Sequence, residues 1–171
     1  MGKIEQGYEI AREKYGEWGI DTDRVLEKMK EIPISVHGWQ IDDLTGFEDF
    51  HGQLTGGIAA TGNMGGKPED QEEYFEQLQR AISMIPGPLK IATHAIYLDN
   101  KGKRVDRDQI GPEHFEKWVE FARKNKTGLD FNPTYFSHRN SEDGFTLSSA
   151  DKGIREFWIE HGKRCRRIGA F

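Results

Sequence analysis

The chain has 171 residues, of which 35% are hydrophobic and 31% charged, and 24 Lys and Arg against 29 Asp and Glu give a net charge of −5. This balance argues against the wide basic face of a nucleic-acid-binding protein, and the single cysteine, Cys165, excludes an internal disulfide and the common cysteine-based zinc sites. Because no apolar run approaches the roughly 18 residues that span a bilayer and no signal-peptide core opens the chain, we expect a globular, cytoplasmic protein without membrane or nucleic-acid partners.

Two helices are predicted at the start of the chain. Residues 3–15 place apolar side chains at helical spacing, and Gly16 breaks the pattern. Asp21 or Thr22 can cap a second, shorter helix. We therefore assign residues 1–31 to an N-terminal helical extension.

A strand, a long loop and a helix are predicted next. The strand covers residues 32–36, and residues 38–68 then hold eight glycines with almost no periodicity. A loop of that length inside a compact domain is typical of an active-site lid or a binding loop. Pro68 suits the first turn of the helix that follows, which carries apolar side chains as far as Ile85.

Two further strand–helix pairs complete the chain. The first has a strand over residues 90–97 and a helix that starts at Pro112, includes Phe115 and ends near Gly128. The second has a very short strand over residues 129–131 and, after a polar loop, a final helix.

The order of these elements predicts an α/β fold with a parallel sheet, because strands alternate with helices. Three strands do not decide between an open, doubly wound sheet and part of a barrel. No Gly-x-Gly-x-x-Gly follows the first strand, which argues against a dinucleotide-binding fold. The segment from Thr61 to Pro68 also lacks the first glycine and the Ser or Thr of a phosphate-binding loop.

Polar and aromatic residues gather where the predicted strands end. They are His37, Trp39, His94, Asp130 and Asn132. In parallel α/β folds this edge of the sheet is where small molecules bind, so the pattern predicts a small-molecule site. Each residue also has a structural reading, since a histidine can serve only as a hydrogen-bonding group, an aspartate can fix a turn and a tryptophan can belong to the core.

Metal and nucleophile sites are poorly supported by the sequence. Asp42, Asp43, Glu48 and Asp49 are loop carboxylates that no regular element holds together, and no helix carries a pair of histidines at ligand spacing. Cys165 lies on a predicted helix without a strand-to-helix elbow. We expect no complete metal site within these residues.

Several long motifs in a fixed order cover the whole chain. They are Trp39-Gln40, Thr45-Gly46-Phe47-Glu48, Leu54-Thr55-Gly56-Gly57-Ile58, Ala60-Thr61-Gly62-Asn63, Ile85-Pro86-Gly87-Pro88, His94-Ala95-Ile96-Tyr97, Arg107-Asp108-Gln109-Ile110, Pro112-Glu113-His114-Phe115, Gly128-Leu129-Asp130-Phe131-Asn132-Pro133 and Asp143-Gly144-Phe145-Thr146-Leu147-Ser148. Together they resemble the N-terminal two-fifths of the L-rhamnose isomerase family.

The resemblance implies a (β/α)8 TIM barrel, of which residues 32–171 would form the first three βα units. It implies an isomerase that interconverts L-rhamnose and L-rhamnulose by a metal-assisted hydride shift, with Mn2+ as cofactor, in a homotetramer. On the same resemblance, His94 is catalytic and helps to open the sugar ring. Trp39, His37 and Phe131 would line the sugar pocket, as aromatic rings suit the apolar face of a sugar.

This chain departs from the family pattern in one respect. The family's metal ligands come from later barrel strands, so none can be carried over to this chain. We therefore expect a fragment that is inactive alone, and a non-catalytic module that binds sugar weakly or docks with a complementary chain is the alternative. A metal-dependent hydrolase on the same barrel, such as an endonuclease, would need a basic groove that the net charge disfavours.

Overall fold

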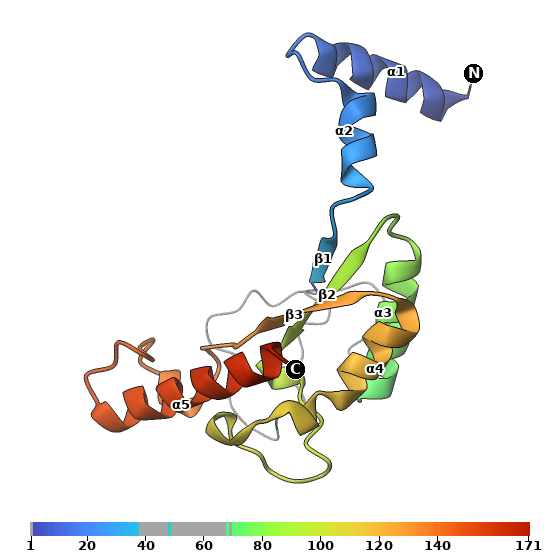
Figure 1. The fold of residues 1–171 in the computed structure, drawn as a ribbon. Coiled ribbons are helices and arrows are strands. Elements are labelled where there is room, and N and C mark those ends of the chain that lie inside the picture. The colour runs from blue at the N-terminus through green and yellow to red at the C-terminus, as the bar shows by residue number, and fades with distance from the viewer. Residues whose placement is uncertain (1, 38–47, 49–67, 69) are drawn as a thin grey trace.

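The computed structural model describes residues 2–37, 48, 68 and 70–171. Its main elements are α1 (Lys3–Gly16), α2 (Thr22–Met29), β1 (Ile34–His37), α3 (Gln71–Ser83), β2 (Leu89–His94), α4 (Glu116–Asn125), β3 (Gly128–Asn132) and α5 (Lys152–Gly169). The three strands form one parallel sheet in the order β1-β2-β3, which confirms the predicted α/β class (Figure 1). Each helix in the described segments is too short or too polar to cross a membrane.

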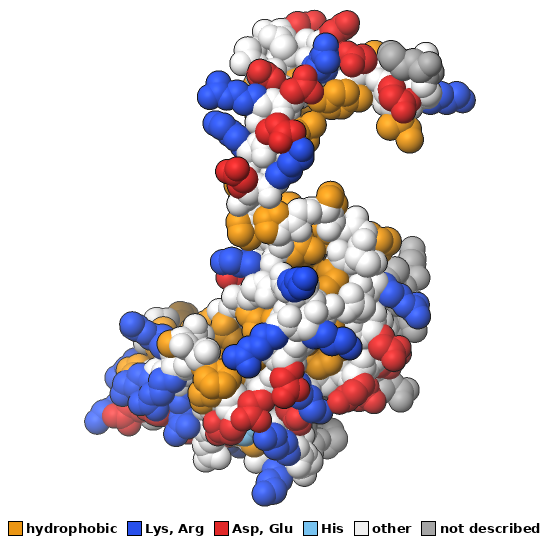
Figure 2. Space-filling view, turned by 45° about the vertical axis from the view of Figure 1, so that its right-hand side comes forward, with side chains coloured by type: hydrophobic (Ala, Val, Ile, Leu, Met, Phe, Trp, Pro, Cys, Tyr) orange, Lys and Arg blue, Asp and Glu red, His pale blue; other side chains and the backbone are white. Residues whose placement is uncertain are grey.

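The helices α1 and α2 stand clear of the sheet and of the other helices (Figure 1). Helix α2 begins where predicted, because the Asp21 side chain accepts a hydrogen bond from the backbone N–H of Arg24 at 3.0 Å. The Tyr8 hydroxyl joins the two helices by donating to Asp23 at 2.6 Å. Neither helix contains a buried residue, and Figure 2 shows apolar side chains among the charged ones on this part of the surface.

Helix α3 starts later than predicted. The expectation that Pro68 occupies its first turn is wrong, because the helix begins at Gln71 with Asp70 as its N-cap. The Asp70 side chain accepts a hydrogen bond from the backbone N–H of Glu73 at 2.8 Å and so satisfies one of the donors left over at the helix start. A capping carboxylate therefore sets this boundary.

The second strand–helix pair is more broken than predicted. Strand β2 ends at His94, and Ala95–Tyr97 forms a 3₁₀ helix rather than the end of the strand. Pro112 starts only a 3₁₀ turn, Pro112–His114, and α4 begins at Glu116. The predicted continuous helix from Pro112 through Phe115 is therefore wrong.

The end of α4 is also different from the prediction. Lys126, with φ of 55°, adopts the left-handed conformation that closes the helix, and Gly128 is instead the first residue of β3. A Cβ on Gly128 would lie 2.9 Å from the Cγ atom of Lys90 on the neighbouring strand. The glycine at this position is explained by close approach between strands rather than by helix termination.

The helices α3, α4 and α5 pack against one face of the sheet and share one apolar core. Side chains of β2 and β3 such as Ile91 and Leu129 lie in this core. The helices contribute Tyr74, Leu78, Trp118, Phe121, Cys165 and Ile168. Because side chains alternate along a strand, the opposite face carries Ser35, His37, Lys90, Ala92, His94, Asp130 and Asn132. The sheet therefore has one apolar face and one largely polar face.

Candidate functional site

The polar face of the sheet brings together most of the residues predicted from strand ends. His37 pairs with Ala92 of β2, and Ala92 pairs in turn with Asp130 of β3. His94 lies two residues farther along β2 and pairs with Asn132. Because all three strands are parallel, His37, His94 and Asn132 lie toward the same edge, as predicted, whereas Asp130 lies in the middle of β3 rather than at its end.

His94 is a buried histidine, 7% exposed, at the last position of β2. Its Nδ1 atom lies 3.3 Å from the hydroxyl oxygen of Thr134, and its ring lies 5.1 Å from the ring of Tyr97 at an angle of 49°. The backbone carbonyl of Tyr97 accepts a hydrogen bond from the indole N–H of Trp118 at 2.9 Å. His94 is therefore held between the polar face and the aromatic core.

Lys90 and Asp130 form an ion pair on the same face of the sheet as His94. The Lys90 ammonium lies 3.1 Å from the Asp130 carboxylate. A hydrogen bond from the side chain of Ser35, together with Lys90, holds the pKa of Asp130 below its ordinary value. Asp130 is therefore ionised at neutral pH. The nearby, exposed His37 contributes in the same direction, since it also lowers the pKa of Asp130.

Two predicted sugar contacts lie elsewhere. Phe131 is on the opposite face of β3, where its ring meets the ring of Phe115 edge to face at 5.0 Å. The structure therefore does not bring Phe131 beside His94, and its contact with a sugar stays a prediction. Trp39 lies outside the described residues, as does most of the long loop 38–68.

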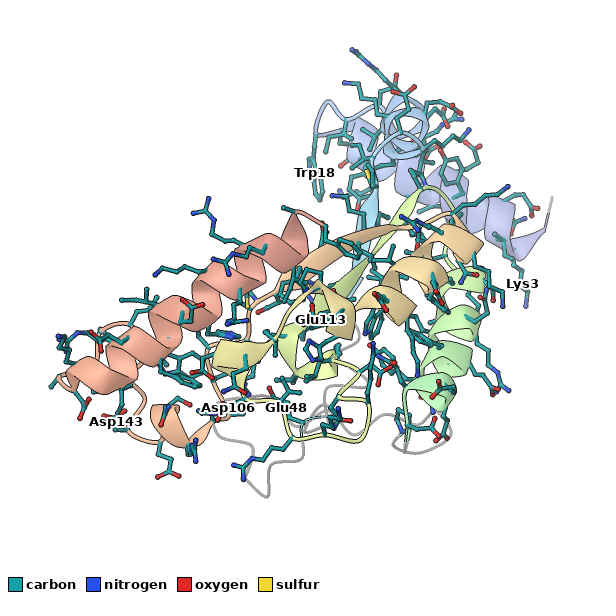
Figure 3. All side chains as sticks on the ribbon, turned by 60° about the horizontal axis from the view of Figure 1, so that its bottom comes forward. Lys3, Trp18, Glu48, Asp106, Glu113 and Asp143 are labelled. Atoms are coloured by element: carbon teal, nitrogen blue, oxygen red, sulfur yellow. The ribbon has the colours of Figure 1, made fainter. Side chains whose placement is uncertain are left out.

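A buried ion pair next to this site was not predicted. The guanidinium of Arg107 contacts the Glu48 carboxylate, with 3.0 Å from Nε to Oε1 and 3.1 Å from Nη2 to Oε2. The two side chains are only 1% and 2% exposed. Burial raises the pKa of Glu48 above its ordinary value, and Arg107 opposes this shift. Figure 3 labels Glu48 and shows it on the same side of the molecule as Asp106.

The same Arg107 side chain binds the segment that follows β3. Its Nη1 donates to the backbone carbonyls of Thr134 and Phe136, both at 2.6 Å, and its Nη2 donates to that of Ser137 at 3.0 Å. Both Arg107 and Glu48 belong to motifs that carry the family resemblance, but they are 59 residues apart. No local pattern of spacing could have paired them.

A second histidine network lies close to Arg107. The Nδ1 atom of His138 accepts from the backbone N–H of Asn140 at 3.1 Å, so its Nε2–H donates to Asp106 at 3.1 Å. Burial and the nearby Arg107 charge lower the pKa of His138 to about 4, despite the opposing effect of Asp106. Burial also lowers the pKa of His161, whose Nδ1 lies 2.9 Å from the backbone carbonyl of Arg107. His138 is therefore a neutral structural group at pH 7, and His161 lies between two backbone carbonyls, those of Arg107 and Pro133.

The described residues do not fit a metal ion. No three side chains among His, Cys, Asp and Glu converge within the ranges that the structure describes. Glu48 is paired with Arg107 and Asp130 with Lys90, so both carboxylates already have cationic partners. Cys165 is buried, and burial raises the pKa of its thiol to about 12, which disfavours the thiolate that a metal binds.

Comparison with known proteins gives a consistent result along the chain. A family model described as L-rhamnose isomerase (RhaA) matches residues 2–171. An L-rhamnose isomerase of Rhodopirellula baltica is 51% identical over 169 residues, which cover 99% of this chain and 39% of the relative. The L-rhamnose isomerases of Citrobacter koseri and of Escherichia coli O139:H28 are each 50% identical over 169 residues and 40% of their length. The chain thus spans about two-fifths of these curated relatives.

Proposed function

The chain belongs to the L-rhamnose isomerase family, and we propose that it is part of an enzyme that interconverts L-rhamnose and L-rhamnulose. The family match over residues 2–171 is the observation that carries this proposal. The position of His94 supports it, because parallel α/β folds bind small molecules at the ends of their strands. We further propose that the complete protein is a cytoplasmic homotetramer.

His94 is proposed to assist the opening of the sugar ring. For the C1–O5 bond of the pyranose to break, the O1 hydroxyl must lose a proton and O5 must gain one. An imidazole can take up and return a proton near neutral pH, which suits this exchange. His37 shares the polar face with His94 and remains a proposed sugar contact, together with Trp39 and Phe131.

The proposed barrel rests on the family resemblance, and the two unlike faces of the sheet support it. We propose that β1, β2 and β3 are the first strands of a (β/α)8 barrel, whose helices lie outside and whose polar strand ends face the site. On the family resemblance, the complete enzyme would bind a manganese ion through residues outside this chain, and that ion would supply Lewis-acid chemistry for a hydride shift between C1 and C2. The described residues do not fit this ion, so the proposed roles of this chain are limited to binding the sugar and moving protons.

A second candidate is a docking unit that is inactive without complementary strands. The observation in its favour is the sheet itself, in which β1 and β3 each have only β2 as a neighbour within the described residues. The chain also covers only 39–40% of the length of its relatives. In this case the polypeptide alone binds sugar weakly and becomes active only with the remaining part of a barrel.

The test is to measure isomerisation by the chain alone and after complementation. We expect the purified 171-residue chain, its mass verified, to convert no L-rhamnose with manganese present. Addition of the remaining segment of the Rhodopirellula baltica relative should restore conversion. In the restored enzyme His94→Ala should lower turnover by about a hundredfold or more if His94 is the acid/base group.

The matched control is His114→Ala, which removes an imidazole that lies on the 3₁₀ turn Pro112–His114 and accepts a hydrogen bond from the backbone N–H of Gly111. Its turnover should stay near that of the unmodified pair. Turnover by the 171-residue chain alone would overturn the docking requirement. An unchanged rate for His94→Ala would assign His94 a structural role.

A further inference from the structure

We infer that Arg107 and Glu48 are a positioning pair that joins the segments following β1, β2 and β3 and so sets how tightly the strand-end site binds its sugar. This inference rests on the proposed function, because the sugar is the proposed ligand of that site. It concerns two residues to which the family resemblance assigns no role.

Arg107 contacts or belongs to the segments that follow all three strands. It lies after β2 itself, on a short 3₁₀ helix, and its Nε and Nη2 atoms donate to Glu48, which follows β1. Its Nη1 and Nη2 atoms donate to the backbone carbonyls of Thr134, Phe136 and Ser137, which follow β3. Because parallel strands end at one edge of a sheet, Arg107 connects three of the segments that surround the proposed site.

The geometry of these contacts depends on a guanidinium. This planar group presents five N–H donors in a fixed fork, so it can bind a carboxylate on one side and carbonyls on the other. A lysine ammonium keeps the charge but is a compact point charge without the fork. The side chains of Arg107 and Glu48 are 1% and 2% exposed, too little to contact a sugar. Their role is therefore to hold other groups in place.

The turn after β3 borders His94 and needs this support. The hydroxyl oxygen of Thr134 lies 3.3 Å from Nδ1 of His94. Thr134 has φ of 56°, a left-handed conformation that a β-branched residue keeps only where its surroundings impose it. Its backbone N–H donates to the Asn132 side chain at 2.8 Å, and its carbonyl accepts from Arg107. Loss of the fork removes one of these two restraints, so the turn can move relative to His94.

A displaced turn should weaken sugar binding more than it slows the reaction. A group that only borders a site interacts with the substrate to the same extent before and during the reaction, so its displacement raises KM and changes kcat little. His94, as the proposed acid/base group, affects kcat instead. The split between KM and kcat therefore separates the positioning pair from the group that moves protons.

The first measurement uses the 171-residue chain and needs no sugar. Backbone ¹⁵N relaxation gives an order parameter for each residue, and residues 134–137 of the unmodified chain should have values of about 0.85, typical of a rigid backbone. In Arg107→Lys and Glu48→Gln these values should fall to about 0.6, while those of β2 stay at about 0.85. The matched control Arg139→Lys alters an exposed arginine that pairs with Asp106 and should leave both sets of values unchanged.

The second measurement uses the chain complemented with the remaining segment of the Rhodopirellula baltica relative. We expect Arg107→Lys and Glu48→Gln to raise KM for L-rhamnose about tenfold and to change kcat by less than about twofold. Arg139→Lys should leave both constants unchanged. If Arg107→Lys does not fold, Glu48→Gln decides the test, because it weakens the pair while leaving Arg107 in place.

Unchanged order parameters in a folded variant would overturn the inference, and so would a lower kcat with an unchanged KM. If the complemented chain converts no L-rhamnose, the proposed function fails, while the order parameters still show whether the pair holds the turn. The two failures are therefore distinguishable.

Discussion

Replacement of Arg107 with Met should strongly destabilise the fold. The side chains of Arg107 and Glu48 are 1% and 2% exposed, and loss of one partner leaves the other charge buried, which costs about 3–5 kcal/mol. Methionine has a similar length but no donors, so three backbone carbonyls after β3 also lose their partner. Glu48→Gln leaves an acceptor opposite the guanidinium and should cost less, about 2 kcal/mol.

Urea unfolding followed by tryptophan fluorescence measures this difference. Trp158 is fully buried, and the Cζ atom of Arg107 lies 5.7 Å from the centre of its ring, so its emission reports on the region. With a denaturant slope of about 2 kcal/mol per M, Arg107→Met should lower the urea midpoint by about 2 M. The double variant Arg107→Met/Glu48→Gln should lose less than the sum of the single losses, because the pair is coupled.

The control for this prediction is Arg139→Met. Arg139 also pairs with an aspartate, but its side chain is 61% exposed, so its loss should cost at most about 1 kcal/mol. If Arg107→Met and Arg139→Met unfold at the same urea concentration, the reasoning about the buried pair is wrong. Additive losses in the double variant would likewise show that Arg107 and Glu48 do not stabilise one another.

Two further predictions concern pH and a helix end. The folded pKa of His138, about 4, is below its unfolded value of about 6.5, so the unfolded chain binds more protons between these values. The contribution of His138 to the free energy of unfolding should be fully present above about pH 6.5 and be lost as the pH falls through about 4. In His138→Gln this loss should be smaller, as measured by urea unfolding at several pH values. Lys126 closes α4 with φ of 55°, a left-handed conformation that glycine adopts without the steric cost of a Cβ atom. Lys126→Gly should therefore raise the melting temperature and stabilise the fold by up to about 1 kcal/mol, and a lower melting temperature would contradict this.

The elements that could be predicted from the sequence are those set by apolar spacing. The helices α1 and α2 and the strands β1 and β3 lie close to where the pattern places them, whereas β2 ends at His94, earlier than the predicted residue 97. The boundaries that were wrong depend on single polar contacts or on the backbone. Asp70 rather than Pro68 sets the start of α3, and Lys126 rather than Gly128 closes α4.

The candidate site could be predicted only in part, for a related reason. Strand ends are visible in a sequence, and His37 and His94 lie at the ends of β1 and β2 as it predicts, whereas Asp130 lies in the middle of β3. The face that a side chain occupies depends on register, and Phe131 accordingly lies among core residues. The pairing of Arg107 with Glu48 is a contact between distant segments, which neither periodicity nor charge could reveal.

The polarity of the two sheet faces bears on the choice between an open, doubly wound sheet and part of a barrel. A doubly wound sheet carries helices on both faces, so both faces of its strands are apolar. Here α3, α4 and α5 share one core with Ile91 and Leu129, whereas Lys90 and Asp130 form an ion pair on the other face. A helix packed over that pair would bury both charges. In the proposed barrel the functional side chains would lie at the carboxyl ends of the strands, and His94, the last residue of β2, would lie there.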